Sequence, residues 1–131
     1  MTVQHIAMIV SSDSSLQFYR LLGFKETFRK VRQNDTVVLM DGHWIQLEIF
    51  IDARHPQHPS GMNEPIGLRH FALMVDGKLE DEVARLKAVF HSAGFDVEFG
   101  TVMEDWTGVR FCFMKDFDGV NIELRECSKA E

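Results

Sequence analysis

The chain has 131 residues, of which 20 are acidic and 14 are basic, and its net charge is −6. Hydrophobic residues make up 45% of the sequence, which is enough for a globular core. No basic stripe marks a nucleic-acid partner, and the longest apolar runs fall far short of the roughly 20 residues that a membrane span needs. The first residues lack the basic start and cleavage site of a signal peptide, so we expect a cytoplasmic protein with two reduced thiols, Cys112 and Cys127.

The first predicted element is a short apolar strand at residues 4–10, QHIAMIV, with a histidine near its start. The same pattern returns as RHFALMV at residues 69–75, so the chain contains an internal repeat. An amphipathic helical stripe follows each strand, and a glycine ends each helix. The two stripes are Leu16, Tyr19 and Leu22, before Gly23, and Leu79, Val83, Leu86 and Phe90, before Gly94.

Three strand-like segments follow each helix. They lie at about 26–32, 35–40 and 44–50 in the first copy and at 96–102, 109–115 and 120–126 in the second. Asp-Gly pairs at 41–42 and 118–119 predict hairpin turns. We therefore predict an α+β fold of two tandem βαβββ modules, whose curved mixed sheets surround a pocket. Within one domain, 1–131, module 1 spans about 1–51, a proline-rich connector 52–67, module 2 about 68–126 and a tail 127–131.

Histidine and glutamate occupy matching positions in the two modules. His5 and His70 begin the first strands, whereas Glu48 and Glu123 each lie between two large apolar residues of the last strands. Since side chains alternate along a strand, the apolar neighbours face the helix and each glutamate faces the other way. If the two sheets curve toward each other, two histidines and two glutamates would line the pocket between them.

The turns extend this interpretation to the neighbouring strands. A two-residue or four-residue loop around 118–119 would put three residues on the face of Glu123, namely Arg110, Cys112 and Met114. A two-residue loop at 41–42 would likewise put Val37 and Leu39 on the face of Glu48. Arg110 could hold an anionic substrate group there, or it could pair with Glu104 or Asp105, and both possibilities stay open.

Five motifs connect the chain to a known family: HIAMIV, FYRLLGF, QLEIF, GLRHFALMVD and KDFDGVNIELRE, which together cover about residues 4–126. With these motifs the sequence resembles the vicinal oxygen chelate superfamily, which includes glyoxalase I, extradiol dioxygenases and bleomycin-binding proteins. The resemblance implies a divalent metal ion held by His5, Glu48, His70 and Glu123. Mixed nitrogen and oxygen ligands suit Ni, Zn, Co, Mn or Fe and do not select one of them.

The resemblance also implies an activity. A glyoxalase I-like, lactoylglutathione lyase-like enzyme moves a proton next to the carbonyl of a small-molecule substrate, while the metal acts as a Lewis acid and stabilises an enediolate. Glu123 is the expected general base and Glu48 the second choice, with Arg110, Cys112 and Met114 as expected substrate contacts. We expect a homodimer, whose metal sites would be built within one chain or across two. The identity of the substrate, and whether it carries glutathione or another thiol, stays open.

Two other functions compete with this one. An Fe(II) extradiol-type dioxygenase uses two histidines and one carboxylate, so a second glutamate ligand argues against it. A non-catalytic protein that binds a bleomycin-type drug needs no metal and need not keep all four ligands. Metal analysis of the purified protein would therefore separate a binding protein from an enzyme.

Overall fold

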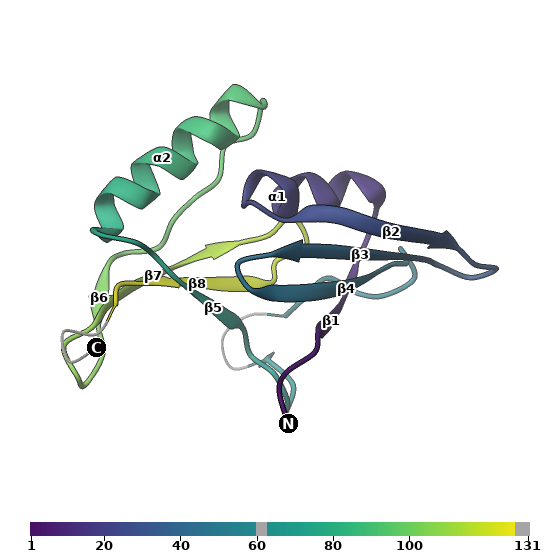
Figure 1. Ribbon diagram of the computed structural model, residues 1–131, viewed down its shortest axis with the longest axis horizontal. Coiled ribbons are helices and arrows are strands. Elements are labelled where there is room, and N and C mark those ends of the chain that lie inside the picture. The colour runs from purple at the N-terminus through teal and green to yellow at the C-terminus, as the bar shows by residue number, and fades with distance from the viewer. Residues whose placement is uncertain (60–62, 128–131) are drawn as a thin grey trace. The chain divides into compact units, whose positions relative to one another are not determined.

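The computed structural model describes residues 1–59 and 63–127 of the chain. It divides into two compact units, Met1–His58 and Pro59–Glu131, and their boundary falls inside the predicted connector. Each unit has its own four-stranded sheet with a helix on one side of it (Figure 1). Among the described residues, none of the helices combines the length and the apolar character that crossing a bilayer requires.

The first unit follows the predicted order of elements. Its strands are β1 (Ile6–Val10), β2 (Lys25–Val31), β3 (Thr36–Gly42) and β4 (Ile45–Ile51), with a 3₁₀ turn η1 (Asp13–Ser15) and helix α1 (Leu16–Leu21) after β1. The sheet order is β1-β4-β3-β2, with β1 parallel to β4 and the other pairs antiparallel. One face of the sheet is apolar and buried together with α1, and its fully buried side chains include Val38, Met40, Leu47, Ile49, Leu16, Phe18 and Tyr19.

The second unit repeats this topology. It consists of β5 (Phe71–Met74), α2 (Leu79–Ser92), β6 (Met103–Glu104), β7 (Arg110–Lys115) and β8 (Asn121–Arg125). The sheet order is β5-β8-β7-β6, and β5 is parallel to β8 as β1 is to β4. Its core consists of α2 and the apolar face of β7 and β8, where Leu79, Leu86, Phe90, Cys112, Met114 and Ile122 are buried. The α+β fold with a duplicated module is therefore confirmed.

Both helices end in the same backbone motif. Gly23 and Gly94 have φ angles of 109° and 90°, which a residue with a Cβ rarely adopts. The next residue in each case, Phe24 or Phe95, donates its backbone N–H to the carbonyl five residues earlier, at 2.9 Å. This is the Schellman arrangement, and its presence in both units shows that the repeat extends to individual hydrogen bonds.

One predicted strand is wrong. Residues 96–102 do not form a strand and pair with β7 only through an isolated bridge between Phe99 and Met114. Further along, Met103 of β6 lies opposite Phe111, whereas continuing the bridge would place it opposite Arg110. This shift by one residue interrupts the ladder, so β6 contains only two residues.

The second hairpin turn includes the predicted Asp118 and Gly119, but its predicted even length is wrong, and this changes which residues share a face. The turn runs over residues 116–120, where the Asp116 N–H donates to the Val120 carbonyl at 2.9 Å and Lys115 pairs with Asn121. Because the loop has five residues instead of an even number, the register between β7 and β8 differs by one residue from the predicted one. Glu123 therefore lies opposite Phe113 and not opposite an even-numbered residue. Cys112 and Met114 lie opposite Leu124 and Ile122 on the buried core face, and the prediction that they share the face of Glu123 is overturned.

Arg110 likewise lies away from Glu123. Its guanidinium bonds to Glu80 of α2 and, at 3.3 Å, to Glu126, so it belongs to the helix side of the sheet. In the first unit the turn residues are His43 and Trp44, because Gly42 pairs with Ile45. That loop has two residues, as predicted, but the predicted position at 41–42 is wrong, because Asp41 and Gly42 belong to β3. The shift of two residues keeps the parity, so Leu39 still shares the face of Glu48 and lies opposite it.

Candidate functional site

The first histidine–glutamate pair lies in unit 1. Ala7 is the register partner of Glu48 in the parallel ladder of β1 and β4, so His5, two residues before Ala7, shares the face of Glu48. The Nε2 atom of His5 lies 3.8 Å from the Oε1 atom of Glu48, and both side chains are partly exposed. The other ring nitrogen of His5, Nδ1, contacts the Gln4 side-chain oxygen. The Nε2 atom of His5 is therefore the one that faces the carboxylate.

Unit 2 repeats this pair. Ala72 of β5 is the register partner of Glu123 in β8, and His70 stands two residues before it. The Nε2 atom of His70 lies 3.7 Å from the Oε1 atom of Glu123. The ring of Phe113 meets the His70 ring edge-on, with the centroids 5.0 Å apart. The predicted sharing of a face by histidine and glutamate is thus confirmed in both units.

Both separations are compatible with a shared cation. Nitrogen and oxygen ligands bind divalent metals such as zinc at about 2.1 Å, so two ligand atoms of one ion lie no more than about 4.2 Å apart. The separations of 3.8 Å and 3.7 Å are within this limit, although both exceed hydrogen-bond length. In residues 1–59 and 63–127, no three histidine, cysteine, aspartate or glutamate side chains gather closely enough to form a metal cluster. Within the described residues, each unit therefore brings together one histidine and one glutamate.

The two glutamates differ in their surroundings. Glu123 is only 8% exposed, and its Oε2 atom accepts a hydrogen bond from Nη1 of Arg125 at 3.3 Å. Glu48 is more exposed, and the residue two places after it in β4 is Phe50 instead of an arginine. Arg125 is not among the site residues predicted from the sequence. Strand alternation could have found it, because residue 125 shares the face of residue 123.

Arg125 is itself held by an acidic turn. Its Nη2 atom donates to Oδ2 of Asp105 at 2.7 Å. The other oxygen of Asp105 accepts hydrogen bonds from the Thr107 hydroxyl at 2.6 Å, the Thr107 backbone N–H at 2.8 Å and the Val109 backbone N–H at 3.2 Å. These bonds, that of the Thr107 hydroxyl first and that of Arg125 next, hold the pKa of Asp105 well below its usual range. Asp105 in turn raises the pKa of Arg125, so both groups are charged at neutral pH.

The three residues expected to contact substrate lie elsewhere. Arg110 is engaged with Glu80 and Glu126, as described above. Cys112 and Met114 are buried in the core of unit 2, and burial raises the pKa of the Cys112 thiol. The face that carries His70 and Glu123 instead presents Phe113 and Arg125.

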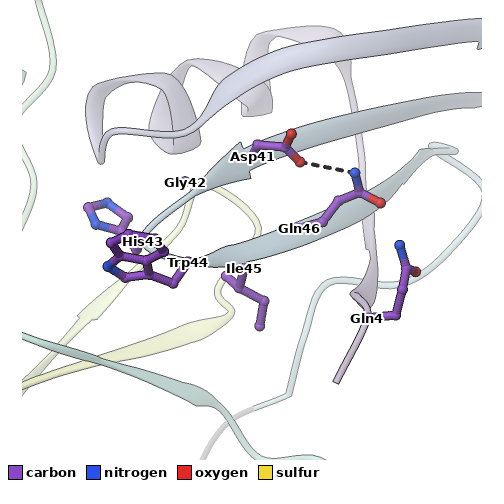
Figure 2. Close-up of a pocket in the computed structure, with 7 residues that line it drawn as sticks. All are labelled: Gln4, Asp41, Gly42, His43, Trp44, Ile45 and Gln46. Atoms are coloured by element: carbon purple, nitrogen blue, oxygen red, sulfur yellow. Dashed lines mark hydrogen bonds between the residues drawn. The ribbon is translucent and has the colours of Figure 1, made fainter. Parts of the chain in front are cut away.

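A separate hollow of about 360 Å³ lies at the tip of the first hairpin. Figure 2 shows its lining, which includes Asp41 and Gln46, joined by a hydrogen bond of 3.0 Å, and the indole of Trp44. Trp44 is fully exposed and has a φ angle of 66°. The hollow includes neither His5 nor Glu48, so it is distinct from the histidine–glutamate pair of this unit.

Comparisons with known proteins identify a family. Residues 2–124 match the model of the Glyoxalase/Bleomycin resistance protein/Dioxygenase superfamily. The chain is 35% identical to the uncharacterized protein YaeR of Escherichia coli strain K12, over 95% of each chain.

Solved structures agree with this match. A glyoxalase family protein from Enterococcus faecalis is 30% identical, with a TM-score of 0.79 over 95% of this chain and 97% of that one. A lactoylglutathione lyase from Agrobacterium tumefaciens is 21% identical, with a TM-score of 0.63 over 97% of this chain and 94% of the other. At that identity the second likeness concerns the fold alone.

Proposed function

Because the chain belongs to the Glyoxalase/Bleomycin resistance protein/Dioxygenase superfamily, we propose that it is a metal-dependent, glyoxalase I-like lyase or isomerase acting on a small molecule. The observation that carries the proposal is the duplicated pair: a histidine Nε2 atom within 3.8 Å of a glutamate Oε1 atom, once in each unit. His5, Glu48, His70 and Glu123 would hold one divalent ion, with both pairs from one chain or from two copies in a homodimer.

The donor set suits this chemistry. Two neutral imidazoles and two carboxylates neutralise a divalent ion and match nickel, zinc, cobalt, manganese or iron. When bound, the ion would supply a Lewis acid that polarises the substrate carbonyl and lowers the barrier to loss of the adjacent proton. Four protein ligands leave room on a six-coordinate ion for two oxygens of water or substrate.

The protein's own groups would move the proton. We assign the general base to Glu123, whose Oε1 atom lies on the His70 side while Oε2 is bonded to Arg125. The carboxylate, as a weakly held ligand that can release the metal, would take a proton from the carbon next to the carbonyl and return it to the neighbouring carbon, which is an isomerisation. The apolar ring of Phe113, opposite Glu123, would exclude water from this carboxylate. Glu48, which is more exposed, would serve mainly as a ligand.

The test begins with metal content. Purified protein stripped with a chelator and reloaded with Ni²⁺, Co²⁺ or Zn²⁺ should bind about one ion per pair of units, measured by elemental analysis and calorimetry. His70→Ala and His5→Ala should each weaken binding strongly, because each removes one of four ligands.

A matched control is available in unit 2. His91 also has a carboxylate neighbour, with its Nδ1 atom 3.5 Å from Oδ1 of Asp96, but both side chains are largely exposed. His91→Ala should leave metal binding unchanged. If the purified protein binds no metal, and neither His5→Ala nor His70→Ala changes its metal content, the result would contradict the proposal and favour a small-molecule binding protein.

The second part of the test is an assay of enzyme activity. The metal-loaded protein should convert the adduct of methylglyoxal with glutathione or another thiol, followed by ultraviolet absorbance. Consumption of oxygen with a catechol, in place of this reaction, would favour a dioxygenase. Metal binding without turnover of any such adduct would leave the metal site intact and contradict the glyoxalase I-like activity.

A further inference from the structure

We infer that Arg125 is a positioning residue for the carboxylate of Glu123, and that Asp105 holds Arg125 in place. This inference deepens the proposed function and rests on it, because the carboxylate in question is the proposed base and metal ligand. It begins from an asymmetry between the two units. The strand position two residues after the glutamate is Phe50 in β4 and Arg125 in β8, although each strand pairs in parallel with the first strand of its unit.

The contacts of Arg125 distinguish the two oxygens of Glu123. The Nη1 atom of Arg125 donates to Oε2 at 3.3 Å, whereas Oε1 lies 3.7 Å from Nε2 of His70. A carboxylate bonded at one oxygen has less freedom to rotate, so Oε1 remains directed toward the histidine. Arg125 therefore favours the use of Glu123 through a single oxygen.

The charge balance explains why an arginine can occupy this position. A lone guanidinium beside a proposed cation site would repel the ion, because two positive charges repel each other more strongly where water is partly excluded. Asp105 cancels that charge at 2.7 Å from Nη2 of Arg125. The pair Arg125–Asp105 is thus neutral overall, while its hydrogen-bond donor remains directed at Glu123.

Hydrogen bonds within its own turn fix the position of the Asp105 carboxylate. Its Oδ1 atom accepts three hydrogen bonds from Thr107 and Val109, and its backbone N–H donates to the Val109 carbonyl at 3.0 Å. The turn between β6 and β7 therefore fixes the position of the guanidinium. Outer groups that orient metal ligands typically change metal affinity about 10–100-fold when they are removed.

The experiment compares Arg125→Met, Arg125→Lys and Asp105→Asn in the whole protein. Arg125→Met should weaken Co²⁺ binding about 10–100-fold and change the visible absorption spectrum of the bound cobalt. Arg125→Lys keeps the charge and should recover part of the affinity. Asp105→Asn leaves an unbalanced positive charge beside Glu123 and should also weaken binding.

The control is Arg85→Met. Arg85 is likewise paired with a glutamate, Glu82, but lies on α2, and its loss should change neither the affinity nor the spectrum. Wild-type affinity and an unchanged cobalt spectrum in Arg125→Met would overturn the inference.

Crystal structures of the metal-free wild type and Arg125→Met separate this inference from the proposed function. We expect Oε1 of Glu123 near His70 in the wild type and displaced or in several conformers in the variant. If the wild type binds no metal and this displacement is still seen, the positioning role stands and the proposed function fails. If Glu123 keeps its position without the guanidinium, the positioning role is overturned whether or not metal binds.

Discussion

Phe113 lies directly opposite Glu123 across the antiparallel ladder of β7 and β8, and its ring also meets that of His70 edge-on. The proposed base is therefore flanked by an aromatic ring, an imidazole and a guanidinium, all from unit 2. Glu48 in unit 1 also has an imidazole neighbour, His5, but Leu39 lies opposite it in place of an aromatic ring, and Phe50 holds the strand position of the arginine. The two halves of the repeat thus offer the same ligand types in unequal surroundings, and this inequality leads to the first prediction.

Glu123→Gln should lower kcat more than Glu48→Gln does. The amide of Gln cannot accept the substrate proton, and loss of a general base typically costs about 10²–10⁴-fold in rate. Glu48→Gln should act mainly by weakening metal binding, so excess metal should restore much of its activity. The measurement is kcat as a function of metal concentration for both variants. Equal rescue of the two variants by metal would contradict the assignment of Glu123 as the base.

The two cysteines should differ in reactivity. Cys112 is fully buried on the core face, and burial raises the pKa of its thiol, whereas Cys127 is exposed. In native protein, iodoacetamide should label Cys127 first and leave Cys112 unmodified until urea unfolds the chain. Mass spectrometry of peptides from native and unfolded samples checks this. Rapid labelling of Cys112 in the native state would mean that it lies on an open face, as the even-numbered loop had predicted.

Gly23→Ala and Gly94→Ala should destabilise the protein to different degrees. Both glycines have positive φ angles, and a side chain there costs about 1–2 kcal/mol. A Cβ on Gly94 would meet nothing within 4 Å, but one on Gly23 would lie 2.8 Å from Nε2 of His43. That nitrogen is hydrogen-bonded to the Leu22 carbonyl at 2.7 Å, so His43 cannot move without losing the bond. Urea unfolding should show the larger loss for Gly23→Ala, and equal losses would refute the role of His43.

Asp105 should make stability depend on pH in the acid range. Its pKa is below the ordinary value of 3.8 in the folded protein, so the unfolded chain binds more protons there and stability rises with pH. The contribution is fully present above the unfolded pKa of 3.8 and is lost as the pH falls from there through the lowered pKa of the folded state. Asp105→Asn should therefore be less stable than wild type at pH 6, and the difference should shrink toward pH 3.

Urea unfolding at several pH values measures this difference. Asp96→Asn, which removes one negative charge from an exposed carboxylate of the same unit, serves as the control. Its stability should follow that of the wild type across the range. A constant gap between wild type and Asp105→Asn from pH 6 to pH 3 would contradict the prediction.

Much of the candidate site follows from local rules. His5 and Glu48, like His70 and Glu123, share a face because side chains alternate along strands and because apolar neighbours seek the helix-covered side. Those rules depend on a few adjacent residues, so a single sequence is sufficient to apply them. The strand predicted at residues 96–102 failed because local pattern does not reveal whether a partner strand is in register.

The sequence by itself determined the duplicated strand–helix order, the glycine at each helix end and the face of each histidine and glutamate, because each depends on short-range periodicity. Only the tertiary structure decided that the second hairpin loop has five residues, which its backbone hydrogen bonds set and which moved Cys112 and Met114 into the core. It also decided that Arg125 meets Asp105, a residue 20 positions earlier in the chain. Contacts of this kind depend on the register between strands, and no periodicity within one strand specifies it.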